Sequence, residues 1–409
     1  MTDWQTLTQQ LKALGVELGK NRVPEAPRRA KYPIESVVEG QFLDLGTDQI
    51  FYREAHYPKD HIHGTRQIWP AGPIQKLCQW ANAGPFSPAD LKDIVFLDTE
   101  TSGLAGGTGT YAFQIGAARF KDDGFHLAQF FMRHPGEEPA LLMGLSNFIA
   151  GMQAVVTYNG KTFDLPLLNT RFTLMGLPNP FAGVDHFDLL PLARRLWRIR
   201  LESRTLGAVE NHILGVKRGV EEVPGYLIPE IYFEYLRSQD ARPLSEIFYH
   251  NAVDILSLAG LFTHMACLLH EPHSKEVQHA EDIVSLGRFF EATGDFSQAK
   301  ALYKKALAKD LPMELLRDTR SRLSFILKRT GNWEAALNLW QQAAQDQELF
   351  AFEELAKYYE HHAKDPDTAY FWASKGKKAL DLCGRPINEC QSWHASLDHR
   401  LKRLLRKIS

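Results

Sequence analysis

Two carboxylates stand at the end of a short apolar run in FLDTETSGL, where one residue separates Asp98 from Glu100. The run at residues 94–97 predicts a buried strand, and because strand side chains alternate, both carboxylates are expected on one face. Two like charges this close repel each other unless a cation lies between them. Mg²⁺ or Mn²⁺ suits that place, since both ions prefer oxygen ligands and retain water. A strand end with two solvated acids is the alternative.

Two further segments carry acids in positions useful for chemistry. In TYNGKTFDLPLL a strand ends in an Asn-Gly turn and Asp164 begins a helix. Taken alone, Asp164 is better explained as the N-cap of that helix. In FYHNAVDILSLAGL, His250 and Asp254 stand four residues apart on one helical face. Taken alone, this is equally a surface pair, and only the three segments together indicate one site.

The three segments follow one another in the order of the three motifs of the DEDD (DnaQ-like) exonucleases, and residues 93–270 resemble that superfamily. The resemblance implies a ribonuclease-H-like fold with two Mg²⁺ or Mn²⁺ ions, one activating a water and one stabilising the leaving 3′ oxygen. The implied metal ligands are Asp98, Glu100, Asp164 and Asp254. The residues assigned to substrate binding lie in the same motifs: Thr99, Thr101, Asn159 and Phe163.

The general-base position departs from both branches of this superfamily. One branch has a His five residues before the last Asp and the other a Tyr four before it, whereas this chain has Tyr249 five before and His250 four before. We assign His250 as the base, because its ordinary pKa of about 6.5 suits proton abstraction near neutral pH. A capping or packing histidine is the alternative. Tyr249 lies about 100° away around the helix and is expected to be buried.

The order of strands and helices around these residues predicts an α/β domain at residues 91–272. This domain is expected to have a central mixed sheet flanked by helices. Strands are predicted at 94–98, 112–120, 126–134 and 154–160. Helices are predicted at 139–152, 164–176, 188–200, 205–215 and 244–269. Residues 1–90 predict an amphipathic helix, a linker and a small β hairpin. In that region His61 and His63 are interpreted as an exposed loop pair, because no third metal ligand is evident.

From residue 278 onward the sequence predicts an all-α region with an internal repeat. Two segments align with an offset of 37 residues, which pairs Gly294 with Gly331, Ala299 with Ala336, Tyr303 with Trp340, and Ala306 with Ala343. They resemble the tetratricopeptide repeat, and a third unit near 355–380 fits loosely. The segments LESRTLGAVENHILG and VPGYLIPEIYFEYLR resemble the bacterial YprB-like group. Proteins of that group join a ribonuclease-H-like domain to tetratricopeptide-like repeats. The basic end of the chain, to residue 409, is interpreted as a helix that caps the repeats.

Composition agrees with a soluble globular protein of two or three domains, because 409 residues are 44% hydrophobic and 23% charged. The net charge of −2 does not indicate a nucleic-acid binder, but only local positive charge is needed for one. Four scattered cysteines and an N-terminus unlike a signal peptide favour the cytoplasm. The apolar stretch at 255–269 is too short and interrupted for a membrane span, so no membrane contact is expected.

We therefore expect a nuclease that removes nucleotides from the 3′ ends of single-stranded DNA or RNA with two divalent ions. The main alternative is a scaffold protein whose repeats recruit a protein partner and whose nuclease fold is vestigial. Four retained carboxylates oppose that alternative, because mutually repelling buried acids are costly without metal. An endonuclease on the same fold is a third hypothesis. Helical repeats offer a concave surface that suits a protein partner.

Overall fold

The computed structural model describes residues 32–46, 48–70, 72–84, 86, 88–103, 109–219, 223–382 and 387–409. The amphipathic helix predicted near the N-terminus lies outside these residues. The chain divides into two compact units. The first, here the sheet unit, runs to Trp69 and includes Ala89–Phe187 and Val216–Gly260. The second, here the helical unit, comprises Pro70–Pro88, Asp188–Gly215 and Leu261–Ser409.

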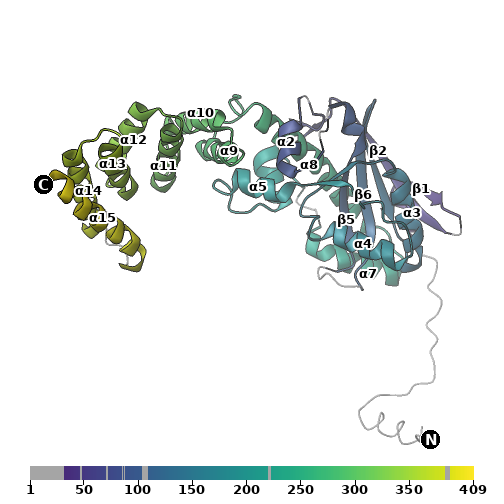
Figure 1. Cartoon of the computed structure of the whole chain (residues 1–409). Helices are drawn as coiled ribbons and strands as arrows, with labels where there is room; N and C mark the ends of the chain where they lie inside the picture. The colour runs from purple at the N-terminus through teal and green to yellow at the C-terminus, as the bar shows by residue number, and fades with distance from the viewer. Residues whose placement is uncertain are drawn as a thin grey trace, which may run out of the picture. The chain divides into compact units, whose positions relative to one another are not determined.

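A mixed sheet in the order β1-β2-β7-β6-β5-β8-β9 forms the centre of the sheet unit (Figure 1). β2, β7, β6 and β5 are antiparallel neighbours, and β8 runs parallel to β5, which confirms the predicted mixed sheet. The predicted N-terminal hairpin, β1 and β2, extends this same sheet. The strands are β1 (Gln41–Asp44), β2 (Gln49–Pro58), β5 (Ile94–Thr101), β6 (Ala112–Lys121), β7 (Gly124–Phe131), β8 (Ala154–Thr157) and β9 (Asp185–Asp188), with a separate pair β3 (Ile62–His63) and β4 (Arg66–Gln67).

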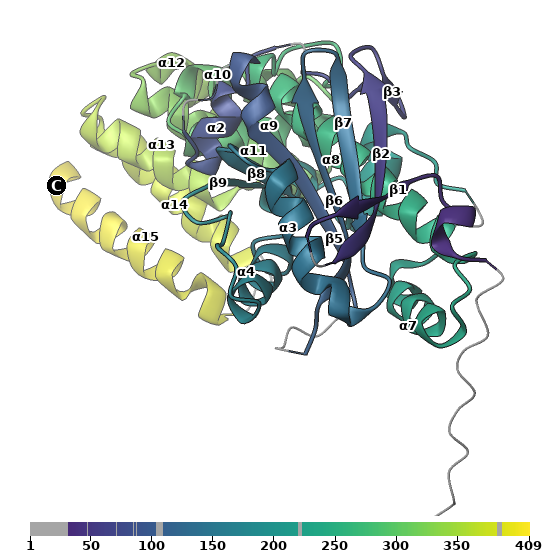
Figure 2. The same cartoon turned by 90° about the vertical axis from the view of Figure 1, so that its right-hand side faces the viewer.

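Helices cover both faces of the sheet, and Figure 2 shows α3 passing in front of it. Ile50 and Phe130 lie beneath α3, while the neighbouring Phe51 and Phe131 pack against Phe248 of α8. Because adjacent strand residues point to opposite faces, α3 and α8 cover opposite sides. The helices of this unit are α3 (Glu138–Phe148), α4 (Asp164–Leu174), α7 (Ile228–Ser238) and the first part of α8 (Leu244–His270).

The long helix α8 is the one described helix that could cross a membrane by length and composition alone. Its most apolar window has a mean hydropathy of 1.8, yet 83% of that window is buried inside the protein. The rest of the protein therefore covers its apolar surface, as the sequence predicted. His63 is covered by the same helix, because its Nε2 lies 2.7 Å from the Ser257 hydroxyl. The interpretation of His63 as an exposed loop residue is therefore wrong, since it is buried.

The helical unit confirms the predicted all-α region, in which α9 to α15 each pack against the next helix in the chain (Figure 1). The helices are α2 (Gln75–Ala81), α5 (Leu189–Trp197), α6 (Leu206–Val209), α9 (Ala280–Ala292), α10 (Phe296–Leu307), α11 (Met313–Arg329), α12 (Trp333–Gln345), α13 (Leu349–His361), α14 (Pro366–Leu382) and α15 (Ile387–Ile408). The predicted helix at 205–215 is the short α6 followed by a π-helical turn at Glu210–Leu214.

Residues that the sequence repeat aligns occupy equivalent places in the fold. Gly294 and Gly331 both adopt positive φ at the turn between two helices, +82° and +75°. The side chains of Asp295 and Asn332, which follow them, each cap the next helix. The aligned small and aromatic residues are all fully buried: Ala299, Ala336, Tyr303, Trp340, Ala306 and Ala343. Equivalent positions therefore bring the paired helices together in the same way.

The loosely fitting third unit has the same construction. At its turn Lys364 takes a positive φ of +59° where the first two units have glycine. The next residue, Asp365, accepts a hydrogen bond from the Thr368 amide at 3.0 Å and so caps α14. Ala369 and Ala373 are buried against the neighbouring helices. The sequence match is weak because lysine replaces the glycine, while the backbone of the turn is kept.

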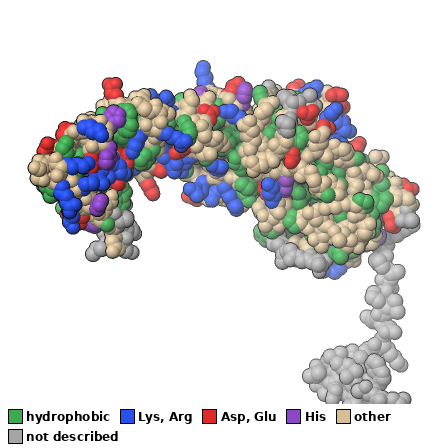
Figure 3. All heavy atoms as spheres, viewed as in Figure 1, with side chains coloured by type: hydrophobic (Ala, Val, Ile, Leu, Met, Phe, Trp, Pro, Cys, Tyr) green, Lys and Arg blue, Asp and Glu red, His purple; other side chains and the backbone are tan. Residues whose placement is uncertain are grey.

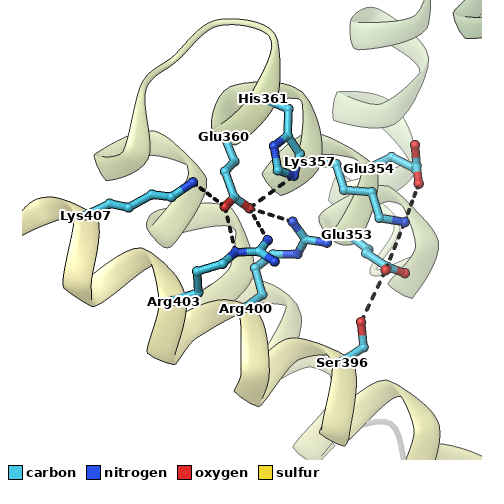
Figure 4. A network of polar contacts seen from close by, with 9 residues as sticks. All are labelled: Glu353, Glu354, Lys357, Glu360, His361, Ser396, Arg400, Arg403 and Lys407. Carbon is cyan, nitrogen blue, oxygen red and sulfur yellow. Dashed lines mark hydrogen bonds and ion pairs between the residues drawn. The ribbon is translucent and has the colours of Figure 1, made fainter.

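The basic last helix packs on this third unit. Lys and Arg side chains gather on the surface of the last helices, at the left of Figure 3. The carboxylate of Glu360 on α13, almost wholly buried, accepts hydrogen bonds from Arg400 at 2.7 Å, Arg403 at 2.6 Å and Lys407 at 2.9 Å (Figure 4). Three cations of α15 thus bind one buried acid of α13, which fits the interpretation of this helix as a cap.

Candidate metal centre

β5 presents the first two carboxylates at the end of an apolar strand. Its residues 94–97 are fully buried, which fixes the strand in the middle of the sheet. Asp98 pairs with Gly116 of β6 and Glu100 with Gln114, before the register becomes irregular at Thr101. Asp98 and Glu100 therefore share one face of the sheet, as the sequence predicts.

That face is covered by α8, and Gly116 makes the close approach possible. A Cβ at Gly116 would lie 2.2 Å from the side-chain oxygen of Asn251, so only glycine fits beneath the helix. Asn251 donates a hydrogen bond to the Asp98 carboxylate at 3.0 Å and accepts one from Gln129 at 3.0 Å. Arg53 in turn donates to Gln129 at 2.6 Å. This row of hydrogen bonds fixes the orientation of Asp98, and the motifs in the sequence did not predict a site role for Asn251, Gln129 or Arg53.

Asp164 reaches the same place from the start of α4. The helix N-cap is Phe163, with no side-chain capping bond, so Asp164 does not serve as the cap. Its carboxylate instead accepts a hydrogen bond from the Thr99 hydroxyl on β5 at 2.5 Å. The tight turn before the helix depends on Asn159, which takes a φ of +68°. Asparagine tolerates this backbone conformation better than most residues, which explains the Asn-Gly sequence.

Asp254 and His250 lie one turn apart on α8, with the His250 Nε2 3.5 Å from the Asp254 carboxylate. Arg218, which the sequence analysis missed, donates to the Asp254 carboxylate and lies 3.3 Å from Nδ1 of His250. Because a guanidinium only donates, Nδ1 must accept, which places the proton of a neutral imidazole on Nε2. Arg218 thus balances part of the site's negative charge and binds Nδ1 of His250.

The carboxylates perturb one another strongly. Burial, followed by the charges of Asp254, Glu100 and Asp164, raises the pKa of Asp98 well above its usual range, against the hydrogen bond from Asn251. Burial and the charges of Asp254 and Asp164 raise the pKa of Glu100 to about 8, while Arg218 opposes the shift. Four acids thus lie within electrostatic reach of each other in a buried place. This all-oxygen donor set fits a hard divalent cation, which would remove the repulsion.

The other predicted residues occupy different positions around the carboxylates. Thr99 binds Asp164, whereas the Thr101 hydroxyl donates to the Gly103 carbonyl at 2.9 Å. Phe163 leaves 54% of its surface exposed. Tyr249 is 53% exposed, so the expectation that it is buried is wrong. The preceding Phe248 fills the core, and the helix therefore turns Tyr249 outward.

The comparisons with known proteins first define the class of protein. Residues 95–266 match the RNase_H superfamily. The fold and the site described above thus belong to a domain of ribonuclease H type, which confirms that part of the predicted resemblance.

A relative then defines the family. The chain is 35% identical over 369 residues to YprB of Bacillus subtilis (strain 168), described as an uncharacterized protein, and the match covers 87% of this chain and 86% of that protein. The chain therefore belongs to the YprB family. The family B DNA polymerase of Pyrobaculum calidifontis matches 49% of this chain, and 29% of its own length, at 15% identity. The TM-score of 0.33 is too low to add to the assignment.

Proposed function

We propose that the sheet unit is a DEDD-type 3′–5′ exonuclease that hydrolyses single-stranded DNA or RNA with two Mg²⁺ or Mn²⁺ ions. Membership of the RNase H superfamily supports a nuclease. The observation that carries the proposal is the carboxylate cluster, in which Asp98 and Glu100 have raised pKa values because they are buried and because other acids face them. An arrangement that disfavours its own ionised form is costly unless a cation binds there.

In this proposal Asp98, Glu100 and Asp254 would hold one ion, and Asp98 and Asp164 would hold the second. When bound, the ions would supply a water of lowered pKa and stabilise the leaving oxygen. The row from Arg53 through Asn251 keeps the Asp98 carboxylate oriented before any ion binds. His250 would accept the proton of the attacking water, which requires Arg218 to release Nδ1. Arg218 would then be placed to pair with a phosphate, the charge it is suited to bind.

We assign substrate contacts to Thr99, Thr101, Asn159 and Phe163. The exposed ring of Phe163, next to Asp164, offers a surface on which an unpaired base can stack. As sequence domains, we assign 1–90 to an N-terminal segment, 91–272 to the nuclease and 278–409 to tetratricopeptide-like repeats that also suit a protein partner. Buried α8 and the cysteines Cys78 and Cys267, which form no disulfide, are compatible with a cytoplasmic location.

The test uses single-stranded DNA and RNA labelled at the 3′ or the 5′ end, with Mn²⁺, with Mg²⁺ and with EDTA. Wild type is compared with Asp98→Asn, His250→Ala and Asp122→Asn, an exposed acid of the same unit that serves as control. We expect metal-dependent shortening from the 3′ end, lost in Asp98→Asn and kept in Asp122→Asn. Oligomeric products from internal cuts would indicate an endonuclease. Absence of cleavage together with absence of metal binding in calorimetry would favour the scaffold hypothesis.

A further inference from the structure

A pocket of about 380 Å³ lies within the helical unit, between α11, α12, α13 and α15. Its lining includes an aromatic wall of Trp333, Tyr358 and His362. The His362 ring lies 4.5 Å from Trp333 and is stacked on Tyr358, at 5.0 Å and 17° between the planes. His362 itself is exposed, so the wall is open to solvent. Flat rings in this arrangement provide a surface for another planar group.

The same pocket is lined by an excess of positive charge. Lys328, Lys357 and Arg400 line it, together with one acid, Glu354. Glu354 is buried and shared, because it accepts from Lys328 at 2.5 Å and from Lys357 at 2.9 Å. Nearby, Glu360 is likewise shared among three cations of α15 (Figure 4). Lys357 also pairs with Glu353 at 2.9 Å, so the cations in excess of acids are those around Glu360, of which Arg400 lines the pocket.

Two buried donors in the lining have no acceptor among the described residues. They are the indole Nε1 of Trp340 and the Nε of Arg400. Trp340 is fully buried, and Arg400 is 8% exposed. A buried donor without a partner is unfavourable by roughly 1–3 kcal/mol, so such groups normally have one. The pocket therefore offers stacking surface and positive charge to one small ligand, and two of its lining residues carry buried N–H donors without a partner among the described residues.

We propose that this pocket binds one nucleotide unit of a single-stranded nucleic acid. The base would lie against Trp333, Tyr358 and His362, and the phosphate would lie among Lys328, Lys357 and Arg400. Each base has a flat face and each phosphate a negative charge, so the nucleotide matches both halves of the lining. An acidic peptide matches only the cations. The volume falls at the small end of ligand pockets. This inference goes beyond the proposed function, because it concerns a binding site in the helical unit that needs no hydrolysis.

The experiment measures fluorescence anisotropy of labelled dT12 and rU12 with the full chain in EDTA, where hydrolysis does not occur. The variants are Trp333→Leu and Tyr358→Leu, which remove the stacking surface. Phe371→Leu is the control, because Phe371 is an exposed ring of α14 outside the pocket lining. We expect each pocket variant to weaken binding about tenfold, the range of one lost base stacking contact, and the control to bind like wild type. Thermal melts verify folding, and Lys357→Gln serves as a third variant if both others melt early.

The outcomes separate this inference from the proposed exonuclease. Equal affinity of wild type and pocket variants, or no binding of either oligonucleotide, would overturn it. Binding of a labelled hexaglutamate, lost in Trp333→Leu while oligonucleotides do not bind, would overturn it in favour of an acidic peptide. If the exonuclease proposal alone fails, wild type still binds oligonucleotides and does not shorten them with Mn²⁺. If this inference alone fails, Asp98-dependent hydrolysis persists and the pocket variants bind normally.

Discussion

Two buried glutamates, one in each unit, have opposite surroundings. Glu100 in the sheet unit faces Asp254 and Asp164, and its pKa is raised to about 8. Glu360 in the helical unit faces Arg403 and Lys407. Burial alone would raise its pKa, but hydrogen bonds from those two cations outweigh burial and hold the pKa at about 2. The same side chain is thus made hard to ionise in one place and hard to protonate in the other.

The difference in surroundings indicates a different role for each of the two glutamates. Cations that belong to the chain itself satisfy Glu360, so its neighbourhood is complete and holds α15 on α13. Glu100 and the three aspartates near it face one another, with Arg218 as a counter-charge to Glu100 and Asp254. A cation from outside would remove the remaining repulsion between these acids. A buried acid among acids therefore points to function, and a buried acid among bases points to stability.

The largest expected effect is on hydrolysis. Asp98→Asn should lower the rate about a thousandfold, because the ions supply several kcal/mol of transition-state stabilisation. Glu360→Gln should keep hydrolysis of a short oligonucleotide close to wild type. Initial rates with Mn²⁺ at matched concentrations of folded protein check both. Comparable losses in the two variants would break the contrast between a functional and a structural acid.

The free energy of unfolding should fall more in Glu360→Gln than in Asp98→Asn, the reverse of the order for hydrolysis. Glu360→Gln leaves buried Arg400 without its charged partner and should cost about 3–5 kcal/mol, the usual penalty for breaking a buried pair. Asp98→Asn in EDTA should be neutral or stabilising, because it removes a repelling charge. Hydrogen exchange read by mass spectrometry assigns the change to peptides of each unit. Faster exchange around β5 in metal-free Asp98→Asn would contradict the argument.

The pH dependence should also have opposite signs in the two units. For Glu100 the folded pKa of about 8 lies above its ordinary 4.5, so the folded protein binds more protons and stability falls as pH rises from 4.5 through 8. For Glu360 the folded pKa of about 2 lies below 4.5, so stability is present above 4.5 and is lost as pH falls towards 2. Hydrogen exchange in EDTA between pH 5 and 8 tests the first sign. Saturating Mn²⁺ should abolish this dependence of stability on pH. A dependence that Mn²⁺ does not change would mean that it does not come from Glu100.

The smallest expected effect comes from two glycines with equally tight surroundings. A Cβ at Gly116 would strike Asn251 at 2.2 Å, and one at Gly287 would strike the ring of Tyr303 at 2.5 Å. Each change to alanine should cost about 1–3 kcal/mol through overpacking. Only Gly116→Ala should also lower hydrolysis, by about tenfold, because Asn251 orients Asp98. Urea titration and rates on the same samples compare them. If Gly287→Ala lowered the rate of hydrolysis as much as Gly116→Ala, the positioning role assigned to Asn251 would be contradicted.

Most elements of the fold and the candidate carboxylates could be predicted from the amino-acid sequence alone. Apolar runs and helical periodicity located β5, β6, β7, α4 and α8 because those signals come from residues close together in the chain. The repeat offset located equivalent turns and buried positions in α9 to α12 for the same reason. The order of three short motifs was enough to predict that Asp98, Glu100, Asp164 and Asp254 belong together.

The side chains that surround these carboxylates could not be predicted from the sequence, because they come from distant segments. The Asn251 amide reaches Asp98 across 153 residues of sequence, and Arg218 reaches Asp254 across 36. The burial of His63 beneath α8 and the outward position of Tyr249 likewise depend on which face of a helix meets the sheet. Such long-range contacts cannot be predicted from local sequence. The burial and charge around each side chain come from segments that are brought together only when the chain folds.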